Sequence, residues 1–526
     1  MQTPETPTVD AHKLDRRLPI LVGCGEVTDL QTPGLSGRSP YELIAQAARL
    51  ALDDTGAAAA LQSGIDAVAM LRLFADTAPR FANALGASSN PPRSVAKRLG
   101  LGAVAHEVYT GNGGNMPQLL VNHYAELIAA GEHRAVLICG GEALRTQRDV
   151  LRAQTPLSWA EDPGGQPQFM GDARRGWSDH EERHGLNGAI AFYPLIENAI
   201  RASRGLGVPQ HMAAMGQLMS RLSAVAAANP LATRREAMSA ERLATVTPDN
   251  RWISFPYPRF MNASAYNDQA AALVMTSVGQ ALDWGIAPEK WVFLHGCAEA
   301  HDHWFVSQRP QLHRSPAMRA VAQQALDMAG QTLADMAFID LYSCFPSALE
   351  VACDECGLAE DDVRGLSITG GLPFFGGPGN NYVTHSIAAM VRKLRAAPGR
   401  FGLVTANGNY LTKHAWAVYS SRPNAGPWRR APSAPLQAQL DALPKAALNE
   451  APQGRGQIEA YTVLHDKGAP AQGIVFGRLA GSGQRFIANS PADAGSLAEL
   501  QDHEALGRPG QVSHHEGANS FVPDPR

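Results

Sequence analysis

The sequence predicts a duplicated α/β fold with an inserted helical domain and a small β domain near the C-terminus. Three observations predict it. The chain repeats one order of apolar strands and glycine-ended helices, the segment between the repeats has a mainly helical pattern, and the last part shows short strands joined by glycine turns. A chain of 526 residues is long enough for such an arrangement.

The first half opens with an apolar, β-branched run at 18–29 that predicts a buried strand. A helix is predicted over 39–56, with Ser39 as its N-cap, Pro40 at its first position and Gly56 as its terminator. Strand and helix patterns then continue to alternate. They cover a strand at 65–73, a short helix at 93–102, and a strand, glycine turn, helix and strand at 107–144.

The second half repeats this order. Its first strand carries the run Leu294–Glu299, which matches Leu21–Glu26. A helix with the same Ser-Pro start follows at 315–330, and the glycine turn, helix and strand at 379–408 parallel those at 113–141. Three matched segments in one order, at offsets between 266 and 274, indicate a duplication.

The β-α-β order of each half implies right-handed crossovers and a mostly parallel sheet with helices on both faces. Composition separates the other parts, because the inserted domain is rich in Arg, Trp, Met and His, and a segment rich in helix breakers reads as a linker. The predicted domains are the first half at 17–144 plus 263–288, the inserted loop domain at 145–262, the second half at 289–421, the linker at 422–456 and the β domain at 457–526.

Composition excludes several classes of protein. Hydrophobic residues make up 45% of the chain and charged residues 18%, and the net charge of −4 argues against a nucleic-acid partner. The polar segment at 1–17 lacks an apolar signal core, and no run of about 18 apolar residues occurs. We therefore expect a cytoplasmic protein without integral membrane contact.

The six cysteines are spread through a long chain, so no disulfide framework is expected. Cys353 and Cys356 form a CxxC pair, but no second pair completes a four-thiolate zinc site. Their spacing places both sulfur atoms on one face of a helix. Core packing is therefore favoured over a redox or metal role, and no metal is predicted.

The stretch from Gly365 to Tyr419 carries the clearest sign of a site. Two glycine-dense turns, Gly370–Gly371 and Gly376–Gly379, precede an apolar helix, and an apolar strand then ends at Ala406–Gly408. Glycine clusters allow close approach of a ligand, and the N-terminus of a helix suits a phosphate, a carbonyl oxygen or an enolate. The alternative is a tight structural connection between packed elements.

The spacing of two glycines, four residues and then Gly376-Gly377-Pro378 resembles the thiolase pattern, whose last triplet is Gly-His-Pro. Over about residues 17–421 the chain resembles the thiolase superfamily, and it is most similar to the branch allied to sterol-carrier-protein-2 thiolases. The resemblance implies a five-layer α/β/α/β/α fold with a loop domain between the halves. It also implies an extra C-terminal β domain similar to an OB fold.

The same alignment shows departures from the thiolase pattern. The histidine of the pattern falls on Gly377, the nucleophilic cysteine falls on about Gly111, and the second cysteine falls on Ala406. The Asn-Glu-Ala-Phe or His-Asp-Cys-Phe segment appears as Tyr342-Ser343-Cys344-Phe345. The nucleophile, the acid/base thiol and the oxyanion-hole imidazole are all absent, which argues against thiolysis through a cysteine ping-pong mechanism.

Few residues near the two turns can transfer a proton. Tyr342 ranks first, because it occupies the place of a catalytic Asn or His and its phenol can donate to an enolate oxygen. His385 is either catalytic or a satisfied core histidine, and His414 faces either the same cavity or the surface. Asn407 and Asn381 can donate to a thioester carbonyl or simply form turns.

Coenzyme A, or an acyl-CoA, is the ligand that the resemblance implies, as a substrate rather than a permanently bound cofactor. The resemblance places it against the loop domain, where Arg174, Arg175 and Arg259 offer forked donors for phosphates, and against the turn of Gly376 and Gly377. A solvated basic face is the alternative for each arginine. Thiolases usually dimerise through the central sheet, so a homodimer is compatible with the resemblance.

Three functions remain open. The first is an acyl-CoA enzyme of the acetyl-CoA acetyltransferase-like acyltransferase family, acting in lipid metabolism and stabilising an enolate at the α-carbon. The second is a retro-aldolase on a β-hydroxyacyl-CoA, with Tyr342 as acid or base and the C-terminal β domain as the fused counterpart of an OB-fold partner. The third is a non-catalytic protein that binds CoA esters.

Overall fold

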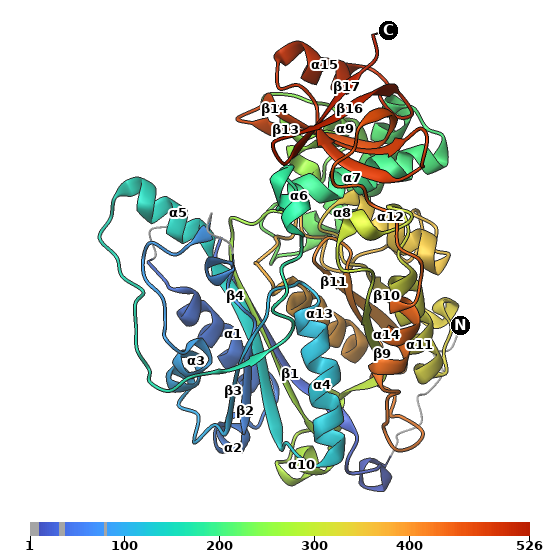
Figure 1. Ribbon diagram of the computed structural model, residues 1–526. Helices are drawn as coiled ribbons and strands as arrows, with labels where there is room; N and C mark the ends of the chain where they lie inside the picture. Colours follow the sequence, from blue (N-terminus) through green and yellow to red (C-terminus); the bar gives the residue numbers. More distant parts are fainter. Residues whose placement is uncertain (1–9, 31–36, 78–80, 526) are drawn as a thin grey trace.

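The structure is a computed structural model that describes residues 10–30, 37–77 and 81–525. A large α/β body contains the two halves, and the C-terminal β domain lies against one end of it (Figure 1). Within the described residues, no helix is both long and apolar enough for a membrane span. Residues 1–9, the first part of the polar N-terminal segment, lie outside the described residues.

The first half follows the predicted order of strands and helices. Ser39 caps the first long helix by accepting from the N–H of Glu42, whose carboxylate accepts in turn from the N–H of Ser39. The elements are β1 (Pro19–Thr28), α1 (Pro40–Asp54), α2 (Ala58–Gly64), β2 (Ala67–Met70), α3 (Pro91–Leu99), β3 (His106–Thr110), α4 (Met116–Ala130), β4 (Ala135–Ala143), and, after the loop domain, β8 (Asp268–Ser277) and α10 (Val278–Asp283).

The second half begins in the same way. Ser315 caps its first long helix by accepting from the N–H of Met318 at 3.1 Å, and Pro316 occupies the first helical position. The elements are β9 (Val292–His301), α11 (Pro316–Ala329), β10 (Met336–Asp340), α12 (Pro346–Cys356), α13 (Tyr382–Ala396), β11 (Phe401–Gly408) and β12 (Lys413–Ser420). Cys353 and Cys356 lie one turn apart on α12 and pack against the core.

The segment between the halves is mainly helical. Its short strand β5 pairs in parallel with β3 and thereby occupies that edge of the main sheet. The elements are α5 (Leu144–Ala153), β5 (Gln168–Met170), α6 (Asp179–Arg183), α7 (Ala189–Arg204), α8 (Val208–Ala228), α9 (Ala240–Ala244), β6 (Trp252–Ser254) and β7 (Tyr257–Pro258).

The strands of both halves, together with β5 of the inserted segment, form one sheet in the order β10-β11-β12-β9-β1-β8-β4-β2-β3-β5. Taken outward from the middle, the order is β1-β8-β4-β2 in one half and β9-β12-β11-β10 in the other, which confirms the duplication. The sheet is mixed rather than mostly parallel, because β8 and β12 run antiparallel to both neighbours. The short turn between β11 and β12 is one reason, since a hairpin joins only antiparallel strands.

Helices separate the two halves of the sheet. Both α4 and α13 contact strands of either half and form the middle layer, whereas α1 covers the outer face of the first half and α11 that of the second (Figure 1). The result is the five-layer α/β/α/β/α arrangement. It brings the N-termini of α4 and α13, with the glycine turns before them, to the same region of the molecule.

The C-terminal β domain is a closed five-stranded barrel. Its strands pair in the order β13-β14-β15-β17-β16, and β13 pairs with both β14 and β16 to close the ring. Strand β6 of the loop domain joins it through Ser254, opposite Leu464. The elements are β13 (Gly454–Asp466), β14 (Ala469–Leu479), β15 (Arg485–Asn489), α15 (Ala494–Asp502), β16 (Pro509–His515) and β17 (Ala518–Pro523).

The segment expected to be an irregular linker contains a helix. Residues Ser433–Asp441 form α14, which packs against β9. Leu436 and Leu440 lie four residues apart on it; Leu440 is buried and Leu436 packs against the main core. Two apolar residues among prolines are too weak a pattern to reveal a single short helix.

Candidate active site

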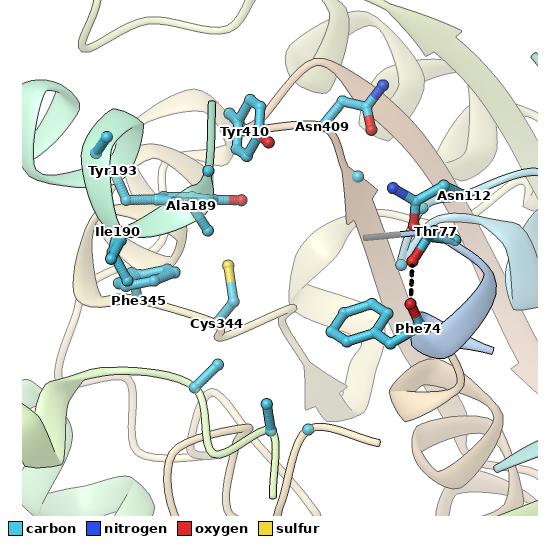
Figure 2. A pocket seen from close by; sticks show the side chains of 18 of the residues that line it. Phe74, Thr77, Asn112, Ala189, Ile190, Tyr193, Cys344, Phe345, Asn409 and Tyr410 are labelled. Carbon is cyan, nitrogen blue, oxygen red and sulfur yellow. Dashed lines mark hydrogen bonds between the residues drawn. The ribbon is translucent and has the colours of Figure 1, made fainter. Parts of the chain in front are cut away.

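A cavity of about 660 Å³ opens where the two halves meet the loop domain. The turns of both halves and the first turn of α7 line it, together with aromatic side chains (Figure 2). Its polar and backbone lining includes Asn112–Gly114, Tyr193, Tyr342, Cys344, Gly377, Gly379, Asn380 and Asn407–Tyr410.

The glycine turns of the two halves face each other across this cavity. The N–H of Gly113 donates to Oδ1 of Asn380 at 2.9 Å, which ties one turn to the other. A Cβ at Gly114 would collide with the hydroxyl of Tyr342 and with the backbone oxygen of Asn407, so only glycine fits there. The cavity therefore depends on close backbone approach between the halves.

Two positions matched to the thiolase cysteines lie slightly off this cavity. Gly111 packs against the backbone of Asp172, and Ala406 is fully buried. Neither lines the cavity, but the residues that follow each of them do.

Tyr342 lines the cavity and lies next to the first glycine turn, because its hydroxyl would meet a Cβ at Gly114. Its N–H donates to Oγ1 of Thr405 at 2.8 Å, and its ring meets that of Tyr382 edge-on at 5.8 Å. Burial, and then the neighbouring Cys344, raise the pKa of its phenol well above the ordinary value. The phenol is therefore protonated near neutral pH and acts as a hydrogen-bond and proton donor.

Tyr193, which the sequence analysis did not select, provides a second phenol. It lies on α7, stacks on Phe345 with ring centres 4.4 Å apart, and donates to Oδ1 of Asn407 at 3.2 Å. Burial raises the pKa of this phenol as well. No local signal distinguishes it from other aromatic residues of an apolar helix, because the path of α7 past the cavity depends on tertiary packing.

Cys344 is the thiol of this site, and it points into the cavity between Phe345 and Phe74 (Figure 2). Burial raises the pKa of this thiol to about 12. Because the thiolate is the nucleophilic form, the group is a poor nucleophile near neutral pH.

The two histidines expected as catalytic candidates do not line the cavity. His385 is fully buried in the core, where its Nδ1 lies 2.6 Å from Oε1 of Glu26, which also pairs with Arg392. His414 is buried on β12 and places its Nε2 3.3 Å from Oδ2 of Asp302, beside the N-cap of α11. Both make structural contacts between segments that are distant in the sequence.

Of the turn residues expected at the site, some line the cavity and others make structural contacts. Asn407 and Gly377 line the cavity, as expected. Asn381 instead donates through Nδ2 to the backbone oxygen of Gly140 at 2.7 Å, and a Cβ at Gly376 would collide with Gln269 rather than face a ligand. The neighbouring Asn380 takes the place expected for Asn381, a choice that a Gly-Asn-Asn sequence leaves open.

The three arginines expected to bind phosphates do not meet at one place. Arg174 pairs with Asp172 at 2.6 Å and stacks 3.7 Å above the ring of Trp304. Arg175 lines the cavity mouth but pairs with Asp179 and with Glu182.

Arg259 belongs to a separate arginine cluster around the ring of Phe260, which also contains Arg234 and Arg242. Arg234 is half-buried, 4.6 Å from the ring centre. Burial, and then the two neighbouring arginines, lower its pKa to about 10. Of the three, Arg259 precedes residues 262–263, which line the cavity, by three residues. A guanidinium in this setting favours a bound anion.

Two buried ionisable groups lie behind the turns. Nζ of Lys413 donates to the backbone oxygen of Asn112 at 2.5 Å, and burial lowers the pKa of this amine to about 8. Oε1 of Glu142 accepts from the N–H of Phe74 at 2.8 Å beside Gly379, and burial raises the pKa of its carboxyl to about 8. Neither residue was a candidate from its sequence pattern.

Two family models match parts of the chain. The model described as thiolase C-terminal domain-like matches residues 298–371, and the model of the additional C-terminal domain of thiolase-like protein type 1 matches residues 435–517. A curated relative, a 3-ketoacyl-CoA thiolase from Erwinia tasmaniensis, is 28% identical over 159 residues. That match covers 28% of this chain and only 35% of the relative.

Solved structures match over much more of the chain. A monomeric SCP2-thiolase-like protein type 1 from Mycobacterium smegmatis is 40% identical, covers 97% of this chain and 100% of that one, and has a TM-score of 0.83. An Ltp2–ChsH2(DUF35) aldolase is 19% identical, with 77% and 98% covered and a TM-score of 0.56. The dimeric peroxisomal thiolase of Saccharomyces cerevisiae is 12% identical, with 78% and 99% covered and a TM-score of 0.56.

Proposed function

The chain belongs to the SCP2-thiolase-like branch of the thiolase superfamily, and from this we propose that it binds an acyl-CoA in the cavity and acts on it without a covalent intermediate. One observation carries the proposal. The phenols of Tyr342 and Tyr193 and the amide of Asn407 converge beside the glycine turns, and no activated thiolate accompanies them among the described residues that line the cavity. These groups donate hydrogen bonds and protons, and none is an activated nucleophile.

The polarity of the first turn suits an enolate. The N-terminus of α4 begins two residues after Gly114, so its positive dipole end lies at the turn. The ammonium of Lys413 adds a full positive charge behind the same turn. A thioester carbonyl placed there would be stabilised as it gains negative charge.

Retro-aldol cleavage of a β-hydroxyacyl-CoA fits this set of groups best. The β-hydroxyl loses its proton and becomes a carbonyl, the Cα–Cβ bond breaks, and its electron pair forms the enolate. Cα then gains one proton. One proton leaves the β-hydroxyl and one is taken up at Cα. A protonated phenol can therefore accept the first on its oxygen as it passes its own to Cα, and it ends unchanged without ionising first. Acyl transfer would instead require Cys344 to ionise, against a thiol pKa of about 12.

The arginine cluster of Arg234, Arg242 and Arg259 is the proposed contact for the phosphates of coenzyme A. Arg234→Met should weaken binding of acetyl-CoA by about tenfold, since a charge-assisted hydrogen bond is lost. Isothermal titration checks this, with acetyl-pantetheine, which lacks the nucleotide phosphates, as a ligand that the change should not affect. Arg221→Met is the matched control, because Arg221 is exposed on α8 and lies beside Asp361. Equal weakening with both ligands would contradict the assignment.

The reaction is tested with a panel of β-hydroxyacyl-CoA esters, acetyl-CoA and acetoacetyl-CoA. Tyr342→Phe should reduce cleavage at least about 100-fold, as expected for loss of a proton-transfer group, while the dissociation constant stays within twofold. Tyr382→Phe is the control, because that buried phenol bonds Thr369 and does not line the cavity. Unchanged cleavage in Tyr342→Phe would remove the mechanism. Tight binding with no turnover across the panel would instead favour a non-catalytic binding protein.

A further inference from the structure

The turn between β11 and β12 has an uncommon backbone. Asn409, Tyr410 and Leu411 follow one another with φ values of 51°, 59° and 59°. Residues other than glycine rarely adopt this left-handed region, and asparagine tolerates it better than tyrosine or leucine. Three such residues in succession persist only where their surroundings hold them. Asn409 and Tyr410 both line the cavity (Figure 2).

Arg309 provides part of that hold. Its Nη1 donates to the backbone oxygen of Tyr410 at 3.1 Å, and its Nη2 donates to Oγ1 of Thr412 at 2.6 Å. The side chain of Thr412 in turn donates to the backbone oxygen of Asn409. Arg309 is only 3% exposed, so these bonds are shielded from water. One buried cation therefore spans the left-handed turn.

The C-terminal β domain holds the segment that carries Arg309. Arg485 of β15 is fully buried and pairs with the carboxylate of Glu459 on β13 through bonds of 2.7 and 2.8 Å. Its guanidinium also donates to three backbone oxygens of the neighbouring segment. These belong to Ser307 at 2.9 Å, to Arg309, and to Pro310 at 3.2 Å.

We propose that Arg485 and Arg309 act in series as positioning residues, through which the C-terminal β domain holds the left-handed turn in place at the cavity. A second observation supports this role of the β domain: Leu464 of β13 lines the cavity directly. The β domain then serves as part of the wall of the site. That the turn faces an acyl-CoA rests on the function proposed above, whereas the mechanical link does not.

Hydrogen exchange of the full-length chain tests the link, read by mass spectrometry on a peptide that covers 408–412. The N–H of Thr412 donates to the backbone oxygen of Gly408 at 3.1 Å and reports on the turn. Arg485→Met and Arg309→Met should each speed exchange in this peptide by about tenfold, since each removes charge-assisted hydrogen bonds. Because the two act in series, the double variant should exchange no faster than Arg309→Met alone.

Arg508→Met is the matched control. Arg508 is also a largely buried arginine of the β domain, paired with Glu499 at 2.7 Å, and its bonds stay within that domain. Its loss should leave the 408–412 peptide unchanged. Unchanged exchange in Arg485→Met, or an equal rise in Arg508→Met, would overturn the proposal. If Arg485→Met does not fold, Arg485→Lys is the substitute. It keeps the positive charge but loses the paired donors of the guanidinium, so it should speed exchange of the 408–412 peptide by less than about tenfold.

A binding measurement separates this proposal from the proposed function. The dissociation constant for acetyl-CoA should rise about fivefold in Arg485→Met, equivalent to loss of roughly one net hydrogen bond, and should not rise in Arg508→Met. If the wild type binds no CoA ester, the proposed function fails while hydrogen exchange still decides the link. Faster exchange with an unchanged dissociation constant would show that the turn does not position the ligand.

Discussion

The glycine turns before α4 and α13 are copies of one another, yet the groups behind them have opposite chemistry. Gly113–Asn115 and Gly379–Asn381 occupy equivalent places, 266 residues apart. The amine of Lys413 lies behind the first turn and the carboxyl of Glu142 lies behind the second. Two similar backbones thus have groups of different polarity behind them.

Burial changes the two groups in opposite directions. It lowers the pKa of the Lys413 amine to about 8 and raises that of the Glu142 carboxyl to about 8. Near pH 7 the first turn therefore has a positive charge behind it, and the second has a neutral acid. The first suits an oxygen that gains negative charge, and the second suits an uncharged part of a ligand.

Gly114→Ala should have the largest effect, because it pushes the two turns apart. The new Cβ would collide with the hydroxyl of Tyr342 and with backbone at Asn407, so the two halves must separate. We expect turnover to fall at least about 100-fold and the free energy of unfolding to fall by about 1–3 kcal/mol, measured by assay and denaturant titration. Gly426→Ala is the control, because nothing lies within 4 Å of a Cβ there. Turnover within threefold of the wild type would show that close approach of the turns is dispensable.

Lys413→Met should remove the positive charge behind the first turn, and we expect about tenfold lower turnover at pH 7. In the wild type, turnover should decline as pH rises through about 8, whereas the variant should lack this decline. Loss of stability would not explain this decline in turnover. The amine has a lower pKa folded than unfolded, so the unfolded chain binds more protons between about 8 and 10.5, and stability rises with pH there. A variant that keeps the same decline would assign it to another group.

Glu142→Gln should have a smaller effect, seen in stability. Burial raises the carboxyl pKa from 4.5 to about 8, so between these values the unfolded chain binds fewer protons and the wild type loses stability as pH rises. The neutral amide removes that loss. The melting temperature of the variant relative to the wild type should therefore increase from pH 5 to pH 8. A constant difference across this range would mean that the carboxyl is already ionised in the folded protein.

Cys344→Ser should have the smallest effect. The thiol lines the cavity, but its pKa of about 12 keeps it protonated, and serine preserves a small donor. We expect turnover to change by less than about threefold, because no covalent step is assigned to this residue. A loss of 100-fold or more would favour the acyltransferase reading over the aldolase one.

Local chemistry and internal similarity made much of the fold predictable. The cap at Ser39 depends on three neighbouring residues, and the matched runs at Leu21–Glu26 and Leu294–Glu299 revealed the duplication. The thiolase resemblance predicted the five-layer arrangement, which brings the glycine turns before α4 and α13 to the same region. Such signals lie within short segments, so a sequence contains them directly.

The missed residues depend on contacts between distant segments. His385 lies near the turns in sequence, but its partner is Glu26, 359 residues away, and this pair holds it in the core. Tyr193 reaches Asn407 across 214 residues because of how α7 packs. The pairing of Lys413 with Asn112 spans 301 residues. Periodicity and propensity contain no information on which distant segments will meet.

The three-residue strand β5 has a consequence for self-association. It pairs along β3 from Val108 to Thr110 and so takes up the hydrogen-bonding groups at that border of the sheet. A second copy of the chain would have to displace β5 before it could pair with β3 and extend the sheet there. Specific activity should accordingly be independent of protein concentration, since a site assembled within one chain needs no neighbour to complete it.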